Sequence, residues 1–342
     1  MSRSEKFDWP LVTINILAYN RKKEVEVTLT KILNELDYPK DKLEIIVVDN
    51  ASTDGTYDMI KEKFPQVKVI RLQKNIGIAG WNCGFREGEG KYFLVLDDDA
   101  YVEGGTLKHM VMVSEREKAD LISIRVVNPK NHVDFTKMYP TGLLSFWGCC
   151  ALISRGIVCK LGGFDENIFI WAHELEFTIR LLSYGGKHIY CPKLTGYHMS
   201  NTNRPLSKNL LRFKLVTNLK HFVYIGAKFF GRRSAFKILL YQVIRLFFVS
   251  IRKMDFILFL KSYDLIVFFL RGLKSRSVIP LELEQLYLEK FIEFVNPLYV
   301  KLKKLKRQDF YDGFYYPQCK CKSIQFNRDH PKVEVQEIEL ET

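Results

Sequence analysis

The sequence of 342 residues lacks the marks of several large protein classes. Its seven cysteines are scattered and odd in number, which argues against a disulfide-built scaffold and favours free thiols in a reducing compartment. Cys319 and Cys321 have no matching second pair of cysteines, so their spacing gives little support to a zinc site. The first residues carry no long apolar run, and we expect no secretory signal. The hydrophobic share of 47% excludes a chain that is disordered throughout.

Positive charge is concentrated in one part of the chain. The net charge is +13, and residues 208–276 alone hold 15 Lys and Arg against 2 Asp and Glu. Charged residues such as Arg245 interrupt the apolar stretches 236–251 and 254–270, so we expect amphipathic helices there rather than membrane spans. Such helices are typical of anionic membrane surfaces, and the alternative is a helical subdomain that packs on the core or on a second subunit. The aromatic residues come as adjacent pairs inside apolar runs, and we expect no nucleic-acid partner.

The composition divides the chain into three parts. We expect residues 1–207 to form an α/β catalytic domain. Residues 208–306 are expected to form a basic amphipathic helical region that contacts a membrane surface or a second copy of the chain in a homo-oligomer. Residues 307–342 are polar, end in acidic residues and are expected to be a partly disordered tail.

The amino-terminal part alternates strand-like runs with helix-like stretches. Strands are expected at residues 11–18, 43–49, 67–72 and 92–96, with helices between them. This alternation predicts right-handed βαβ crossovers and a sheet covered on both faces, in which ligands bind beyond the carboxyl ends of the strands. Polar residues follow three of the strands, at 19–20, 49–54 and 97–99. We therefore expect a binding site at this edge of the sheet.

Three consecutive acids follow the last of these strands. Asp97, Asp98 and Asp99 would repel one another at the end of a buried strand unless a cation or a hydrogen-bond network neutralised them. Carboxylate oxygens are hard ligands that suit Mg²⁺ or Mn²⁺, and these metals also bind diphosphate oxygens. The alternative is a capped turn with solvated acids. The cluster predicts a divalent-cation site beside a diphosphate.

A second group of acids lies on a helix expected over residues 171–180. Glu174 and Glu176 project about 200° apart on a helix, so at most one of them points squarely into a cleft. A carboxylate in that position can accept a proton from a hydroxyl nucleophile. Glu176 and Arg180 are four residues apart and can pair along the helix. Taken alone, the pattern also fits an ordinary solvated helix with one ion pair.

The motifs together resemble one family. Small residues at 75–84 (NIGIAGWNCG) let a helix start approach a ligand closely. In chain order the motifs are YN (19–20), VDNASTDGT (48–56), NIGIAGWNCG, LDDDA (96–100), GGFDENIFIWAHELEFTIRL (162–181) and a later histidine, His198. This order resembles family 2 glycosyltransferases, in particular inverting bacterial enzymes of the rhamnosyltransferase type. The resemblance covers roughly residues 10–200 and implies the GT-A nucleotide-diphospho-sugar transferase fold, an α/β fold with a Rossmann-like mixed, mostly parallel sheet.

The resemblance also implies roles for single residues. The donor and nucleotide positions of the family match Tyr19, Asn20, Asp49, Asn75, Gly80, Asn82, Asp97 and Asp98. Asp99 and His198 match the metal positions, and Glu174 matches the acid that deprotonates the acceptor. The acceptor or sugar region matches Asp165, His173 and Glu176. Many members have Glu-Asp where this chain has His173-Glu174, which moves the carboxylate by about one methylene and leaves Glu176 as an alternative base.

The implied function is the transfer of a single sugar, with inversion, from a nucleotide-diphospho-sugar to a hydroxyl acceptor, assisted by Mn²⁺ or Mg²⁺. We expect a glycan acceptor, above all a lipid-linked glycan of the cell envelope, and a cytoplasmic enzyme peripheral on the inner face of the cell membrane. A processive polysaccharide synthase would share the first half, but its Gln-x-x-Arg-Trp motif has only the partial match QVIRL at 242–246. A nucleotidyltransferase would need a glycine-rich loop after the first strand, which LAYNRKK lacks. A non-catalytic scaffold that binds nucleotide sugars is the third alternative.

Overall fold

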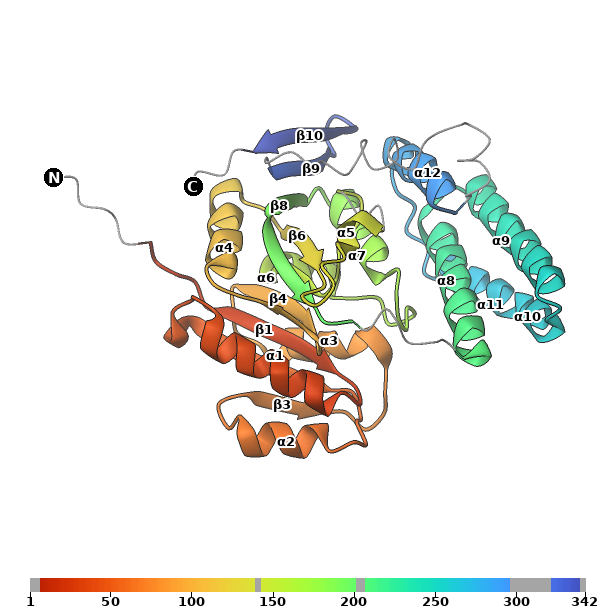
Figure 1. Cartoon of the computed structure of the whole chain (residues 1–342). Helices are drawn as coiled ribbons and strands as arrows, with labels where there is room; N and C mark the ends of the chain where they lie inside the picture. Colours follow the sequence, from red (N-terminus) through yellow and green to blue (C-terminus); the bar gives the residue numbers. More distant parts are fainter. Residues whose placement is uncertain (1–6, 139–142, 201–206, 296–320, 339–342) are drawn as a thin grey trace.

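The protein is described from a computed structural model that places residues 7–138, 143–200, 207–295 and 321–338 (Figure 1). Its strands are β1 (Val12–Ala18), β2 (Leu43–Asp49), β3 (Lys68–Arg71), β4 (Tyr92–Asp97), β5 (Ala100–Val102), β6 (Leu121–Val127), β7 (Cys150–Ser154), β8 (Lys187–His198), β9 (Cys321–Asn327) and β10 (Lys332–Ile338). Its helices are α1 (Lys22–Glu35), α2 (Thr56–Lys63), α3 (Trp81–Glu87), α4 (Thr106–Glu117), α5 (Phe135–Met138), α6 (Arg155–Leu161), α7 (His173–Ser183), α8 (Lys208–Phe229), α9 (Arg232–Arg252), α10 (Phe256–Leu260), α11 (Ser262–Lys274) and α12 (Leu281–Val295).

The strands form one mixed sheet in the order β10-β9-β8-β6-β7-β4-β1-β2-β3, with β5 paired to β8. β4, β1, β2 and β3 run parallel to one another, and β7 enters antiparallel between β4 and β6. The register sets Ala18 opposite Asp49 and Leu17 opposite Asp97. The segments after β1, β2 and β4 therefore leave the sheet at one edge, which confirms the α/β sheet and brings the polar strand ends together.

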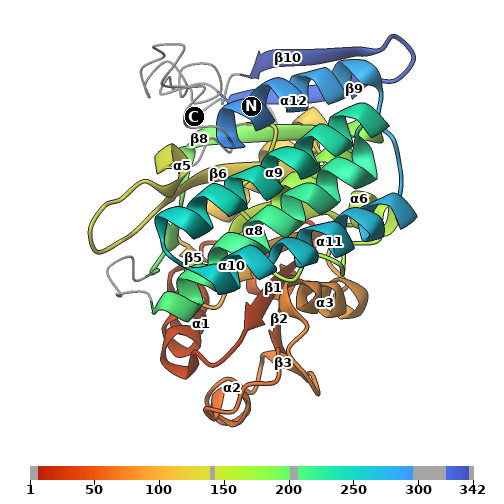
Figure 2. The ribbon, with the colours of Figure 1, turned by 90° about the vertical axis from the view of Figure 1, so that its right-hand side faces the viewer.

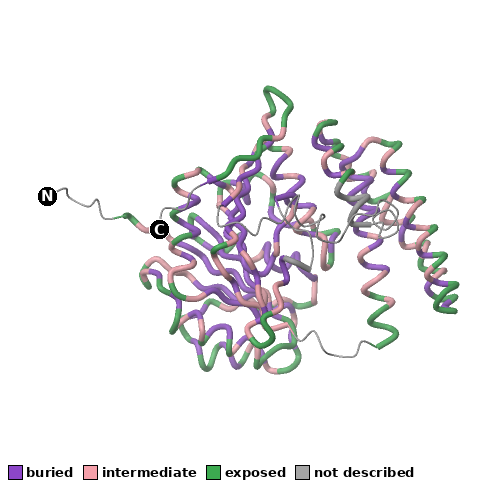
Figure 3. The backbone as a smooth tube through the Cα atoms, turned by 45° about the horizontal axis from the view of Figure 1, so that its top comes forward, coloured by how far each residue is buried: buried purple, intermediate pink, exposed green. Residues whose placement is uncertain are grey.

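Helices cover both faces of the sheet, which explains the near-continuous apolar sequence of its central strands. On one face the core contains Val25 and Leu29 of α1 and Met110 of α4. On the other face it contains Trp81 of α3 and Phe177 of α7. Figure 3 shows the buried residues gathered along the strands.

The carboxy-terminal segment completes the sheet, which differs from the expectation of a polar tail at 307–342. β9 pairs antiparallel with β8, and β10 pairs with β9 at the edge of the sheet (Figure 1). Ile324 and Phe326 of β9 are buried in the core. The physical reason is that Ile324 and Phe326, two residues apart, share one face of β9 and join one core, while Cys321 joins the core on the other face. The outer strand β10 keeps its charged residues in solvent. The rest of the expected tail lies outside the described residues.

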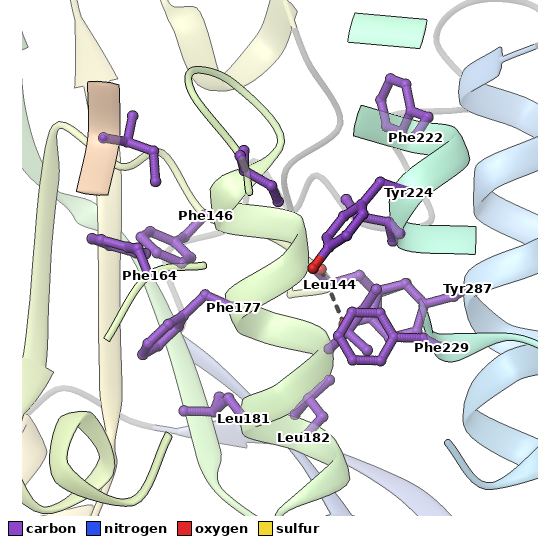
Figure 4. Packing of buried hydrophobic residues seen from close by; sticks show 14 of the residues in the cluster. Leu144, Phe146, Phe164, Phe177, Leu181, Leu182, Phe222, Tyr224, Phe229 and Tyr287 are labelled. Atoms are coloured by element: carbon purple, nitrogen blue, oxygen red, sulfur yellow. Dashed lines mark hydrogen bonds between the residues drawn. The ribbon is translucent and has the colours of Figure 1, made fainter. Parts of the chain in front are cut away.

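Helices α8–α12 form a layer beyond α7 (Figures 1 and 2). α8 lies on the inner side of this layer, and every residue from His221 to Phe230 is buried. Figure 4 shows α7 between two apolar groups, with Phe164 and Phe177 toward the sheet and Tyr224 and Phe229 toward the helical layer. One hydrophobic core therefore extends from the sheet through α7 into the basic helical region.

Candidate functional site

A cavity of about 290 Å³ opens at the carboxyl ends of β1, β2 and β4. It is lined by residues from seven separate segments of the chain: Leu17, Tyr19, Asn50, Asn75, Gly77, Ile78, Trp81, Asp97, Asp98, Trp147, Gly148, Cys149, Phe169, Ile170, Trp171, His173, Glu174 and His198. Seven residues expected from the sequence are in this lining: Tyr19, Asn75, Asp97, Asp98, His173, Glu174 and His198. The lining therefore combines a group of acids, several aromatic rings and the Glu174 carboxylate.

The acidic wall holds a group with metal-ligand geometry. Ligand atoms of Asp97, Asp99 and His198 all lie within 4.8 Å of one another. His198 reaches this group because β8 pairs with β5, which sets Ala100 opposite His198, and its Nε2 lies 3.0 Å from Asp99 Oδ1. Two carboxylates and one imidazole form a donor set that suits Mn²⁺ or Mg²⁺ completed by phosphate oxygens. The chemistry of these residues therefore fits a divalent cation.

Arg21 neutralises part of this acidic wall. Its guanidinium contacts Asp99 Oδ2, and its Nε lies 3.6 Å from Asp98 Oδ1. Asp98 also accepts a hydrogen bond from the Tyr19 backbone N–H at 3.1 Å. Burial raises the pKa of Asp98 well above its ordinary value. Burial acts in the same direction on Asp99, but His198 and Arg21 outweigh it and hold the pKa of Asp99 below its ordinary value.

Glu174 lines the same cavity from the first turn of α7. Its side chain is largely buried, and burial raises the pKa of Glu174 to about 7. His173 Nδ1 lies 3.1 Å from Glu174 Oε2, and burial lowers the pKa of His173 to about 4, so this imidazole is neutral. A Cβ at position 148 would lie 2.8 Å from His173 Nε2, so glycine lets the turn before β7 approach this pair. A carboxyl group with a pKa near 7 suits a general base.

The chain enters α7 through a strained segment. Trp171 and Ala172 have φ values of 58° and 60°, a left-handed conformation that costs about 1–3 kcal/mol for each such residue. The Phe169 carbonyl accepts a hydrogen bond from the Ile78 N–H at 2.9 Å, and a Cβ at Gly77 would lie 2.0 Å from that oxygen. The loop before α7 is therefore fixed to the glycine-rich segment across the cavity.

Asn20 and Asp49 hold the loop after β2. The Asn20 side-chain oxygen accepts a hydrogen bond from the Thr53 N–H at 2.7 Å. The backbone N–H of Asn20 donates to Ser52 Oγ at 2.9 Å. Asp49 is fully buried and accepts from the Ser52 N–H at 3.1 Å. Asn20 has a φ of 52°, which asparagine adopts more readily than most residues. Both residues therefore adjoin the cavity and shape its rim without lining it.

Gly80 and Asn82 are also placed behind the cavity wall. A Cβ at Gly80 would lie 2.4 Å from Leu17 Cδ1, so the glycine permits close packing of the helix start on β1. The Asn82 amide clamps the backbone of Phe164, donating to its carbonyl at 2.8 Å and accepting from its N–H at 2.8 Å. Asn82 thereby ties α3 to the GGFDE segment that precedes α7.

Asp165 and Glu176 are outside the cavity lining and belong to a buried ion cluster. Lys228 of α8 donates to Asp165 at 2.6 Å and to Glu176 at 2.7 Å. Arg180 donates to both oxygens of Glu176, at 2.7 and 2.6 Å, which confirms the expected pairing along the helix. Lys228, Tyr224 and Asn167 lower the pKa of Asp165 to about 2, against the opposite effect of burial. Since Glu176 is committed to this cluster, Glu174 is the carboxylate of α7 that faces the cavity.

Sequence reasoning missed Arg21 and the aromatic wall. Arg21 directly follows the Tyr-Asn motif at the end of a strand that neighbours the three acids. A basic residue in that position could have indicated an ion pair with them. Trp147 and Cys149 line the cavity from a segment with no motif of its own. Lys228 is 52 residues away from Glu176 in the sequence, and no local pattern connects them.

The model of glycosyl transferase family 2 matches residues 13–201. A relative from Bacillus subtilis (strain 168), named probable glycosyltransferase YdaM, is 31% identical over 54% of this chain and 49% of its own length. The match thus spans about half of that relative. A relative from Methanococcus voltae, named dolichyl N-acetyl-α-D-glucosaminyl phosphate 3-β-D-2,3-diacetamido-2,3-dideoxy-β-D-glucuronosyltransferase, is 31% identical over 56% of this chain and 68% of its own length.

The fold of the chain is similar to that of a solved structure. The mannosyltransferase PcManGT from Pyrobaculum calidifontis, in complex with GDP-Man and Mn²⁺, superposes with a TM-score of 0.53 at 19% identity. The superposition covers 89% of this chain and 85% of that chain. The expected GT-A fold is confirmed, including a mixed central sheet with helices on both faces.

Proposed function

The chain belongs to glycosyl transferase family 2, and on that premise we propose that it transfers one sugar from a nucleotide-diphospho-sugar to a hydroxyl acceptor with inversion at the anomeric carbon. The observation that carries this proposal is the placement of Glu174 in the same cavity as Asp97, Asp98 and His198. A single displacement needs a base for the acceptor and binding groups for the leaving diphosphate within one cavity.

Glu174 acts as the base in this proposal. The acceptor oxygen forms a bond to the anomeric carbon while the bond from that carbon to the diphosphate breaks. The hydroxyl proton passes to the Glu174 carboxylate. A pKa of about 7 lets this carboxylate be ionised at neutral pH and still accept a proton. The His173 ring lies 3.1 Å from Glu174 and is neutral, so it is a polar neighbour of the carboxylate and forms no ion pair with it.

The acidic wall binds the diphosphate side of the donor. A Mn²⁺ or Mg²⁺ ion held by Asp97, Asp99 and His198 would offset the charge that develops on the leaving diphosphate. Tyr19 and Asn75 line the same end of the cavity, and we propose that they contact the nucleotide together with the rim held by Asn20 and Asp49. Asp49 is the proposed reader of the nucleobase.

We further propose a lipid-linked glycan of the cell envelope as the acceptor. The relative from Methanococcus voltae is named for a dolichyl phosphate-linked sugar, and a relative from Escherichia coli is named for a diphosphoundecaprenol-linked sugar. The aromatic wall formed by Trp81, Trp147 and Trp171 supports a sugar acceptor, because ring faces pack well against the apolar faces of sugars. The enzyme would then act from the cytoplasm as a peripheral protein of the inner membrane face.

Thermal stabilisation by free nucleotides tests the donor site. UDP, dTDP, GDP and CMP are added in turn, with and without Mn²⁺, to the wild type, Asp99→Asn and Lys23→Ala. A ligand at about 100 times its Kd adds about 2.7 kcal/mol to the native state. We expect one nucleotide to raise the Tm in a Mn²⁺-dependent manner in the wild type and in Lys23→Ala, and not in Asp99→Asn. No shift with any nucleotide would contradict the proposed donor site.

A further inference from the structure

Exposed apolar side chains gather on the outer helices of the helical layer. Of 25 large apolar side chains that are exposed in the described part of the chain, 13 lie between residues 236 and 270. These helices, α9, α10 and α11, face the viewer in Figure 2. Isolated exposed apolar residues are normal on a soluble protein, but a gathered set marks an interaction surface.

Helix α9 has two distinct faces. Its inner face packs on α8 through Ala235, Ile238, Gln242, Leu246 and Ser250, all buried. Its outer face exposes an apolar stripe with a spacing of three to four residues: Phe236, Leu240, Ile244, Phe247, Phe248 and Ile251. Because the inner face accounts for the packing of the helix, the protein's own core does not explain the outer stripe.

The stripe continues around the turn into α10 and α11. Met254 in the turn is 92% exposed, Phe256 at the start of α10 is 73% exposed and Tyr263 of α11 is 69% exposed. We call the exposed apolar residues of 236–270 the outer apolar surface. The Arg212–Asp255 ion pair, at 2.6 Å, sets the first turns of α8 beside this turn.

Basic residues accompany the outer apolar surface. Exposed cations lie along it at Arg232, Arg233, Lys237, Arg252, Lys253, Lys261, Arg271 and Lys274. The sequence from 232 to 274 holds two acids, of which Asp255 is buried against Arg212 and Asp264 lies 3.7 Å from Lys261. Apolar side chains edged by cations match an anionic bilayer, which offers hydrocarbon below and phosphate groups above.

We propose that the outer apolar surface inserts into the interface of an anionic membrane, with α9 lying in the membrane plane. A second copy of the chain is a poor occupant, since a two-fold contact would set this basic surface against itself. Among the described residues α9 is also the one helix long and apolar enough to span a membrane. If α9 spanned the membrane, its buried face, which includes Gln242, would lose its packing on the other helices, and Arg245 would lie inside the bilayer. The interfacial position is therefore favoured.

The surface also approaches the cavity. Leu210, Leu211 and Phe213 on the first turns of α8 are exposed, and the Phe213 ring centroid lies 6.1 Å from that of Trp171, which lines the cavity. A membrane-bound acceptor would therefore reach the site along α8. This last step rests on the proposed function, whereas membrane binding does not.

Vesicle flotation with the full-length protein tests the proposal. Vesicles contain phosphatidylcholine with phosphatidylglycerol, or phosphatidylcholine alone. The variant Ile251→Ser/Met254→Ser/Phe256→Ser alters the surface, and Val27→Ser/Met112→Ser/Val335→Ser removes three exposed apolar side chains elsewhere. Since all six positions are exposed, both variants should keep the wild-type Tm.

We expect the wild type and the control to bind the anionic vesicles and the surface variant to bind about tenfold more weakly, because three inserted side chains are lost. Neutral vesicles and high salt should weaken wild-type binding, and alkaline carbonate should release it. Equal binding by the two variants, or no binding by the wild type, would overturn the proposal. If the protein stays on the vesicles after carbonate treatment, α9 spans the membrane instead of lying in its interface. If the wild type and the control form a dimer and the surface variant does not, the outer apolar surface binds a second copy of the chain. If nucleotide still raises the Tm of the surface variant, the proposed donor site is intact in that variant, whatever its membrane binding.

Discussion

Lys228 of α8 lies 2.7 Å from Glu176 of α7, and the same ammonium group lies 2.6 Å from Asp165. A cation from the helical layer thus neutralises two buried acids of the glycosyltransferase domain. A chain cut before α8 would lose this cation and would also uncover the apolar side chains of α7 that α8 packs against. Membrane binding is therefore better tested by surface substitutions than by truncation.

We predict that Lys228→Met destabilises the protein by about 3 kcal/mol, because removing one member of a buried ion cluster leaves uncompensated charge. Urea unfolding of the variant measures this loss. Lys237→Met on exposed α9 is the matched control and should change the free energy of unfolding by less than about 0.5 kcal/mol. Similar unfolding midpoints for Lys228→Met and the control would show that the cluster contributes little to stability.

Arg21 contacts the Asp99 carboxylate, which is a ligand of the proposed cation. We predict that Arg21→Ala binds Mn²⁺ about tenfold more tightly than the wild type without nucleotide, since the metal no longer displaces a guanidinium. Isothermal titration with Mn²⁺ measures this affinity. Lys23→Ala, two residues away and exposed, should bind Mn²⁺ like the wild type. Weaker Mn²⁺ binding by Arg21→Ala would mean that Arg21 supports the metal site instead.

The carboxy-terminal hairpin should contribute to global stability. Phe326 of β9 is 1% exposed, and we expect Phe326→Ala to cost about 3 kcal/mol because it leaves a cavity in the core. Val335→Ala on β10, 51% exposed, is the control and should be nearly neutral. Chemical denaturation with a tryptophan fluorescence readout compares the two. An unchanged midpoint for Phe326→Ala would place β9 outside the cooperative unit.

Ionisation of Glu174 should lower the free energy of unfolding as the pH rises. Its pKa is about 7 in the folded protein against an ordinary value of 4.5, so between these values the folded state keeps a proton that the unfolded state has lost. The free energy of unfolding therefore falls across this range, by at most about 3 kcal/mol. Glu174→Gln should remove this loss, and its stability gain over the wild type should grow between about pH 5 and about pH 8. A gain that is independent of pH would contradict the raised pKa.

The sequence predicted the site where local patterns determine geometry. Apolar strands that end in polar residues placed Asp97 and Tyr19 at one edge of the sheet, because parallel strands share their carboxyl ends. The four-residue spacing of Glu176 and Arg180 predicted their ion pair for the same reason, namely fixed helix geometry.

Contacts between distant segments were not predictable in this way. Nothing near Lys228 indicates that it meets Glu176, since the packing of α8 on α7 sets that distance. The hairpin β9–β10 was missed because its short alternation is weak against the polar residues around it. The preference for Glu174 over Glu176 as the candidate base is likewise supported by tertiary contacts, which bury Glu176 in the ion cluster.

Sugar transfer by Glu174→Gln is the most direct test of the central claim. The wild type and the variant are compared with the nucleotide sugar whose nucleotide stabilises the protein and with a lipid-linked glycan acceptor. The account predicts that transfer falls by about 10²–10⁴-fold while the Kd for the donor changes by only a few-fold, because the amide fills the space of the carboxylate but accepts no proton. Transfer near the wild-type rate would contradict the assignment of Glu174 as the base.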